Sequence, residues 1–140
     1  MSESRSTLIP SHRYHNAPAA IDWLCNVLGF ERHTVIEGEN GVIHHAQLTL
    51  GNSMIMLGTG RDDEFGRHFK TPDDLGGAET CRLYIVVADA DAAHARAVAA
   101  GAVIVRPLQD RPFGGRDFIV KDPEGNTWTA GTFDPWAKRE

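Results

Sequence analysis

Long apolar runs are absent from this 140-residue chain, and cysteine is scarce. No segment approaches the roughly 20 consecutive apolar residues that a bilayer-spanning helix requires, so no membrane partner is expected. The N-terminal residues are polar and no apolar stretch follows them, so no signal peptide is expected either. The two cysteines, Cys25 and Cys81, lack CxxC spacing. We interpret them as buried thiols in a reducing cytoplasm rather than as a catalytic nucleophile.

Basic residues are fewer than acidic residues. Fourteen Lys and Arg face 19 Asp and Glu, which gives a formal net charge of −5. This balance argues against nucleic acid as a partner and is compatible with a cationic or neutral small ligand. Glycine loops that open a helix, as phosphate-binding loops do, are missing, and no Ser-His-Asp arrangement can be recognised.

The chain contains an internal duplication. Helix-capping residues recur at Asn16 and Asp89, and glycines that end helices recur at Gly29 and Gly101. Turns of the type Gly-Asn recur at residues 51–52 and 125–126, so the three offsets are 73, 72 and 74 residues. Strands are expected at residues 8–15, 30–37, 42–50, 53–57, 80–88, 103–108, 116–121 and 127–132. The sequence therefore predicts an α+β fold of two strand–helix–three-strand modules in one structural domain.

The predicted boundaries are 8–58 for the first module and 80–133 for the second. Residues 59–79 form the connection, which is rich in Gly, Asp and Arg and lacks clear periodicity. A connection of this length either covers a pocket or runs along a dimer edge.

These features resemble the vicinal oxygen chelate superfamily, which includes glyoxalase I, extradiol dioxygenases and bleomycin-resistance proteins. The resemblance rests on AIDWL at residues 20–24 leading to LGF at 28–30, and on the turn DPEGN at 122–126. It covers residues 8–133. It implies two mixed sheets that form a concave cavity with helices outside, and it implies a homodimer.

The resemblance also implies where metalloenzymes of the superfamily hold one divalent ion. Those positions fall at Ile9, Met56, Leu83 and Thr129, none of which is a usual ligand for such an ion. We therefore expect no metal and no cofactor. The metal-free members that the sequence most resembles are the bleomycin-resistance proteins, which bind a cationic drug in clefts of a homodimer.

Strand alternation predicts which side chains face the cavity. The expected ligand-binding residues are Ser11, Arg13, His45, Gln47, Met56, Leu83, Asp117 and Thr129. Two alternatives stay open: Arg13 and Asp117 form a structural salt bridge, or His45 and Gln47 join an acidic group in an unorthodox metal site. Trp128 and Tyr84 are expected to face the helices.

The sequence thus favours a metal-independent protein that binds and sequesters a drug or metabolite. The alternative is a glyoxalase-like lyase, isomerase or dioxygenase with an altered metal site. A third interpretation is an accessory module with no ligand.

Overall fold

The structure is a computed structural model that describes residues 7–61 and 63–137. The first module contains β1 (Ser11–Tyr14), α1 (Ala17–Leu28), β2 (Glu31–Glu37), β3 (Ile43–Leu50) and β4 (Ser53–Thr59). The second contains β5 (Arg82–Val86), α2 (Ala90–Ala99), β6 (Val103–Asp110), β7 (Arg116–Lys121) and β8 (Thr127–Gly131). The predicted α+β fold of two equivalent modules is confirmed.

Both helices begin after the predicted caps, and α1 ends at the predicted Gly29, whereas α2 ends at Ala99 with Ala100 as its C-cap, before the predicted Gly101. The Asn16 side chain accepts from the backbone N–H of Ala19 at 3.2 Å, and Asp89 accepts from Ala92 at 3.0 Å. Each bond satisfies one of the N–H groups that a helix start leaves unpaired. Gly29 follows α1 with a φ of 85°, a left-handed conformation that glycine adopts without strain.

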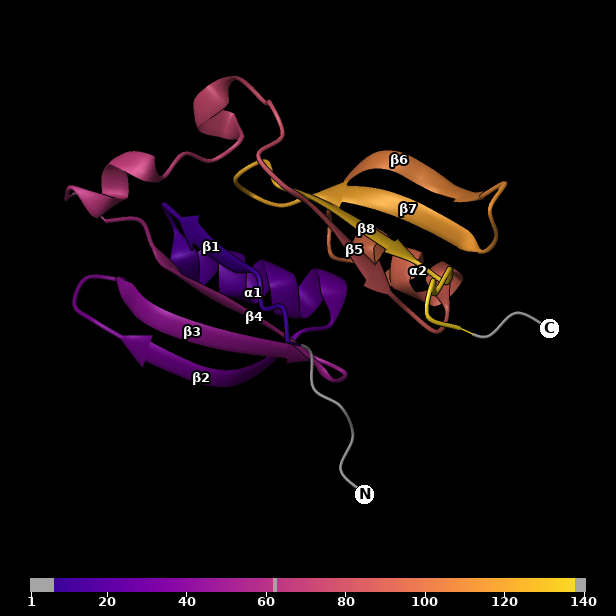
Figure 1. Cartoon of the computed structure of the whole chain (residues 1–140), viewed down its shortest axis with the longest axis horizontal. Helices are drawn as coiled ribbons and strands as arrows, with labels where there is room; N and C mark the ends of the chain where they lie inside the picture. The colour runs from indigo at the N-terminus through magenta and orange to yellow at the C-terminus, as the bar shows by residue number, and fades with distance from the viewer. Residues whose placement is uncertain (1–6, 62, 138–140) are drawn as a thin grey trace.

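Each module builds one four-stranded sheet. The strand orders are β1-β4-β3-β2 and β5-β8-β7-β6, with the first strand of each module parallel to the last and the other pairs antiparallel. The two sheets lie side by side, and α1 and α2 lie on the same side of the molecule, behind their sheets in Figure 1. We call the face of each sheet that points away from the helices its open face.

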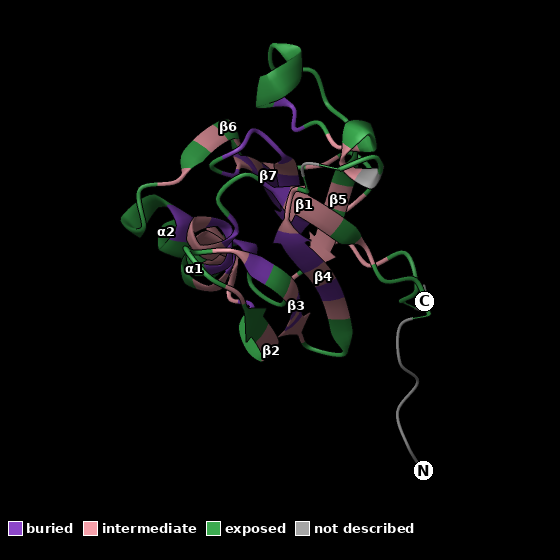
Figure 2. Cartoon of the chain, turned by 90° about the vertical axis from the view of Figure 1, so that its left-hand side faces the viewer, coloured by how far each residue is buried: buried purple, intermediate pink, exposed green. Residues whose placement is uncertain are grey.

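The core fills the space between helices and sheets, where Figure 2 shows most of the buried residues. Ile21 and Leu24 are buried on α1, as its periodicity predicts, but Cys25 on the same helix is only half-buried. Cys81 is exposed, so the prediction of two buried thiols is wrong. Burial nevertheless raises the pKa of the Cys25 thiol.

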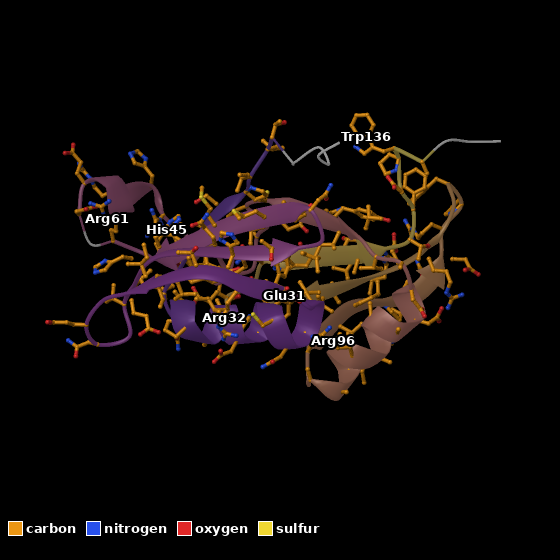
Figure 3. All side chains as sticks on the ribbon, turned by 90° about the horizontal axis from the view of Figure 1, so that it is seen from below. Glu31, Arg32, His45, Arg61, Arg96 and Trp136 are labelled. Atoms are coloured by element: carbon orange, nitrogen blue, oxygen red, sulfur yellow. The ribbon has the colours of Figure 1, made fainter. Side chains whose placement is uncertain are left out.

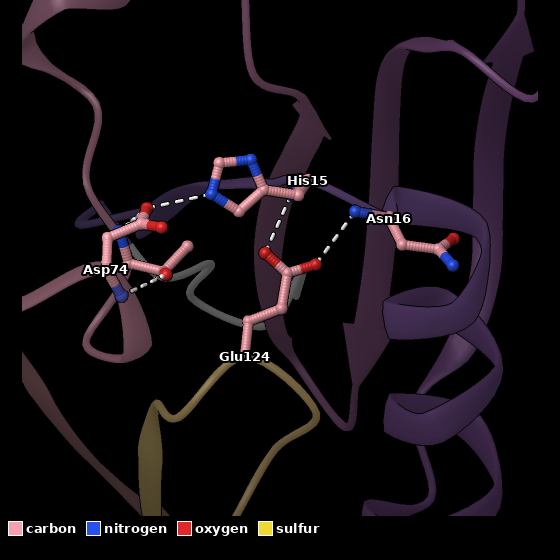
Figure 4. A network of polar contacts seen from close by, with 5 residues as sticks. His15, Asn16, Asp74 and Glu124 are labelled. Atoms are coloured by element: carbon pink, nitrogen blue, oxygen red, sulfur yellow. Dashed lines mark hydrogen bonds and ion pairs between the residues drawn. The ribbon is translucent and has the colours of Figure 1, made fainter. Parts of the chain in front are cut away.

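The closing turn of the second module ties it to the first. The buried carboxylate of Asp122 accepts from the Tyr14 hydroxyl at 2.7 Å and from the indole N–H of Trp128 at 3.2 Å. Glu124 accepts from the backbone N–H groups of His15 and Asn16 at 2.7 and 2.8 Å (Figure 4). The turn therefore fixes the end of β1 and the start of α1.

The helices provide a second junction between the modules. Arg96 of α2 donates to the carbonyl oxygens of Asn26 and Cys25 at the end of α1, at 3.1 and 3.0 Å (Figure 3). A guanidinium at this position satisfies carbonyl groups that the last helical turn leaves unpaired.

The connecting segment contains two short 3₁₀ turns, Phe65–His68 and Asp73–Leu75. It is anchored by the His15 ring, whose Nε2 lies 2.7 Å from Asp74 Oδ2 (Figure 4). The backbone N–H of Thr71 donates to the same carboxylate at 2.9 Å. Together the Thr71 N–H and then the His15 ring lower the pKa of Asp74 to about 2.

Candidate functional site

The open face of the first sheet carries a row of side chains from adjacent strands. The register pairs Ser11 of β1 with Met56 of β4, and Met56 with Gln47 of β3. The Gln47 amide nitrogen lies 3.5 Å from the sulfur of Met54. His45 precedes the buried Ala46 and is only half-buried, which agrees with its predicted side of β3. Strand pairing thus brings together Ser11, Gln47 and Met56, three of the predicted site residues.

Arg13 lies over a glycine on this face. It pairs in register with Gly58, and a Cβ atom built on Gly58 would lie 2.4 Å from a guanidinium nitrogen of Arg13. Glycine on a strand often marks such a close approach. The Arg13 guanidinium therefore lies close to the β4 backbone, in space that a side chain at Gly58 would fill.

The residues on the open face of the second sheet differ from the predicted ones. Tyr84 of β5 pairs with Thr129 of β8, which pairs with Ile119 of β7. Leu83 pairs instead with Trp128 and packs against the core. Because successive strand residues point to opposite faces, Tyr84 lies on the open face and Leu83 does not. The predicted faces of Leu83 and Tyr84 are therefore both wrong, because the position expected on the open face was displaced by one residue along β5. Trp128 is buried, as predicted.

A second glycine allows Tyr84 and Asp117 to approach each other. A Cβ atom on Gly131 would lie 2.6 Å from both the Tyr84 hydroxyl oxygen and the Asp117 Cβ. The Tyr84 hydroxyl donates to the Phe133 carbonyl at 2.8 Å. Burial, followed by the negative charge of Asp117, raises the pKa of Tyr84.

Asp117 is buried, with 3% of its surface exposed, and it has two arginine partners. Arg106 donates to Oδ1 through a short hydrogen bond, and Arg111 Nε lies 3.8 Å from Oδ2. The Gln109 amide lies beside both guanidiniums. The alternative of an Arg13–Asp117 salt bridge is therefore wrong, because Asp117 pairs instead with Arg106 of β6 and with Arg111, the residue that follows β6. Asp117 lies on β7 beside β8, which carries Thr129, but its carboxylate interacts with Arg106 and Arg111.

The connecting segment covers a cleft, as one of the two sequence interpretations predicts. The cleft has a volume of about 340 Å³ and lies between β1, the start of β5, the closing turn and the connecting segment. Its described lining residues are Pro10, Ser11, His12, Arg13, Arg61, Gly66, His68, Phe69, Lys70, Thr71, Thr80, Cys81 and Asn126. Ser11 and Arg13 are thus the predicted site residues that reach it.

His12 lines the same cleft from the helix side of β1. Its ring lies 5.6 Å from that of Trp128. Burial lowers the pKa of His12, although the charge of Asp122 acts in the opposite direction. A neutral imidazole therefore faces the cleft at neutral pH.

The metal that the fold implies does not fit the residues at its expected positions. In the observed register, Ser11 pairs with Met56 and Tyr84 pairs with Thr129 on the open faces of the two sheets, at the four strand positions where the ion is expected. These are hydroxyl, phenol and thioether side chains, and divalent ions of this kind prefer imidazole and carboxylate. Within residues 7–61 and 63–137, no three His, Cys, Asp or Glu side chains come close enough to hold an ion.

Several residues at the site escaped the sequence interpretation. The cleft residues Phe69 and Lys70 lie in a segment without periodicity. Of the two partners of Asp117, Arg106 lies on β6, where two irregularities shift the register, and Arg111 follows that strand. One signal was present: Gly58 and Gly131 are single glycines within strands, which mark close approach of another group. No helix within the described residues, 7–61 and 63–137, is long and apolar enough to cross a membrane.

Comparison with known proteins agrees with this architecture. Residues 13–130 match the glyoxalase/bleomycin resistance protein/dioxygenase superfamily. An uncharacterised protein of Mycobacterium bovis is 32% identical over 116 residues, which cover 83% of this chain and 76% of that protein.

Two solved structures share the fold. TioX from Micromonospora sp. ML1 superposes with a TM-score of 0.70 at 31% identity, covering 95% of this chain and 100% of TioX. TnmS3, an antibiotic binding protein from Streptomyces sp. CB03234, superposes with a TM-score of 0.66 at 21% identity, covering 93% of this chain and 96% of TnmS3. The chain belongs to the glyoxalase/bleomycin resistance protein/dioxygenase superfamily.

Proposed function

We propose that this protein binds a small molecule without a metal ion and sequesters it. The observation that carries the proposal is the cleft of about 340 Å³, which Ser11 and Arg13 line together with the connecting segment. Ser11 also belongs, with Met56, Tyr84 and Thr129, to the four paired strand positions at which the ion of the superfamily is expected. A concave site that mixes apolar surface with a few polar groups suits a small ligand. The same positions offer no donor set for the ion that catalysis in this superfamily would use.

Shared architecture supports binding as the role. TnmS3 has the same fold and is an antibiotic binding protein. The fold itself hosts several activities, so the side chains at the site decide between them. Ser11 and Arg13 contact the cleft directly, while Gln47, Met56, Thr129 and His45 lie on the open faces. We propose these residues as the ligand-contacting set, with Tyr84 replacing Leu83.

We also propose that the protein acts as a homodimer. Apolar side chains on β5 and β6 are left exposed in one chain: Tyr84 by 40%, Val86 by 48%, Val103 by 61% and Val105 by 49%. Exposed apolar side chains at the edge and on the open face of a sheet are stabilised when a second copy of the chain covers them. Light scattering coupled to size-exclusion chromatography measures the oligomeric state. A monomer at micromolar concentration contradicts this part of the proposal.

Two measurements test the function. Elemental analysis after purification without chelator is expected to find substoichiometric metal, and added Ni²⁺, Zn²⁺, Mn²⁺ or Fe²⁺ should not raise the melting temperature. A thermal-shift screen of drugs and metabolites should yield ligands that stabilise the protein in proportion to RT ln(1 + [L]/Kd). Stoichiometric metal that is lost on His45→Ala would favour the glyoxalase-like enzyme instead. A screen without any stabilising compound would favour an accessory module.

The remaining assignments follow from the chain's chemistry. A net charge of −5 disfavours nucleic acid as a partner. Cys25 and Cys81 are both free thiols, which fits the reducing cytoplasm that we propose as the location.

A further inference from the structure

Charge at the cleft has the opposite sign to the charge of the whole protein. The chain carries a formal net charge of −5. Among the described residues that line the cleft, Arg13, Arg61 and Lys70 are basic and none is Asp or Glu. A ligand in the cleft therefore meets a local field that favours negative charge.

Among the basic residues that line the cleft, Arg13 is the best placed to pair with a charged ligand. Its partly buried side chain rests over Gly58 on the open face of the first sheet. It forms no ion pair within residues 7–61 and 63–137, because Asp117 is paired with Arg106 and Arg111. A guanidinium without an ion-pair partner offers two parallel N–H groups to the two oxygens of a carboxylate.

The connecting segment contributes further charge and an apolar surface. Arg61 pairs with Asp63 at 2.8 Å, so its charge is largely balanced, whereas Lys70 is exposed. Phe69 packs over Gly60, where a Cβ atom would lie 2.4 Å from its ring, and it lines the cleft together with Pro10 and Cys81. The cleft therefore combines a cationic group with flat apolar walls.

We infer that the ligand is an organic anion: a carboxylate or similar acidic head on an apolar ring-bearing body, with the head paired to Arg13. This inference rests on the proposed small-molecule binding and narrows its ligand class. It replaces the cationic ligand that the net charge suggested, because the excess acidic residues lie outside the cleft lining.

The test uses three probes of one shape and different charge: naphthoate, neutral naphthamide and naphthylmethylammonium. Isothermal titration at low salt should show that naphthoate binds at least about tenfold more tightly than either of the others, as expected for one charge-assisted pair. Added salt should weaken naphthoate binding selectively. Arg13→Gln should abolish the preference, whereas Arg32→Gln should retain it. Arg32 carries the same charge, but it contacts Asp22 on α1 instead of the cleft.

A second measurement locates the probe without a substitution. Cys81 lines the cleft and is exposed, whereas Cys25 lies outside it on α1. Saturating naphthoate should slow thiol labelling of Cys81 at least about fivefold and leave Cys25 unchanged. Unprotected Cys81, or naphthamide or the ammonium probe binding as tightly as naphthoate, overturns the inference. If naphthoate fails while another probe binds, small-molecule binding survives; if none binds, both proposals fall.

Discussion

The Tyr14 hydroxyl donates a 2.7 Å hydrogen bond to the buried carboxylate of Asp122, 108 residues later in the chain. Burial, and then the charge of Asp122, raises the pKa of Tyr14 far above its ordinary value. The same carboxylate accepts from Trp128 and from the backbone N–H groups of Glu124 and Asn126. This single side chain therefore holds the closing turn of the second module against β1 of the first.

Replacing Asp122 by Asn should destabilise the protein by about 2–3 kcal/mol. The substitution turns one acceptor oxygen into an NH₂ group, which would face the O–H and N–H groups that now donate to the carboxylate. Tyr14→Phe, which leaves the other bonds intact, should cost about 1.5 kcal/mol. Urea denaturation followed by circular dichroism measures both values. Equal and small losses, below about 0.5 kcal/mol for each variant, would show that the contact contributes little to folding.

Asp117→Ala should destabilise by about 3 kcal/mol, because it leaves Arg106 and Arg111 partly buried without their shared carboxylate. Asp110→Ala is the matched control, since Asp110 is exposed and pairs with Arg116 across the hairpin. Its cost should stay below about 0.5 kcal/mol. A ligand that loses affinity for a correctly folded Asp117 variant would instead give Asp117 the binding role that the sequence suggested.

Gly131→Ala should destabilise by about 1–3 kcal/mol, because the added methyl group meets the Tyr84 hydroxyl and the Asp117 Cβ, both at 2.6 Å. Adding Tyr84→Phe should recover part of the loss, because it removes one of the two contacts. Thermal or chemical unfolding of the two single variants and the double variant forms a thermodynamic cycle. Strictly additive losses would place Tyr84 away from Gly131.

Stability should fall as pH drops from about 7 to about 5, and His12 should account for part of that fall. Its folded pKa is lowered by burial, so below its ordinary pKa the unfolded chain binds a proton that the native state refuses. The contribution is present above about pH 6.5 and is lost towards acid, at no more than about 1.4 kcal/mol per pH unit. His12→Phe should flatten the profile, whereas exposed His33→Gln should not. An unchanged slope in His12→Phe would assign the loss to other groups.

The connecting segment should loosen in acid. The pKa of Asp74 is lowered to about 2 by the Thr71 N–H and the His15 ring, so these contacts stabilise the folded state above about pH 4 and are lost as pH falls towards 2. Limited pepsin digestion at about pH 3 should cut residues 61–79 faster in Asp74→Asn than in the parent protein. Asp73→Asn, one residue away, is the control. Equal rates for all three would show that Asp74 does not hold the segment.

Local features of the sequence determined the modules. Asn16 and Asp89 cap helices through their own side chains, and residues 122–126 form a turn, because these preferences depend on neighbouring backbone groups. Their near-constant spacing is the sequence signature of the duplication.

Tertiary structure decided the contents of the site. A one-residue change in position reverses the face of a strand residue, so Leu83 and Tyr84 could be separated only by the pairing of β5 with β8. The partner of Asp117 depended on bulges in β6, which leave no sequence pattern, and this choice freed Arg13. The net charge describes the whole chain, whereas a ligand meets only the charges that folding gathers at the cleft. For that reason the sequence determined the superfamily's fold, and the packed structure determined which charged side chains line the cleft.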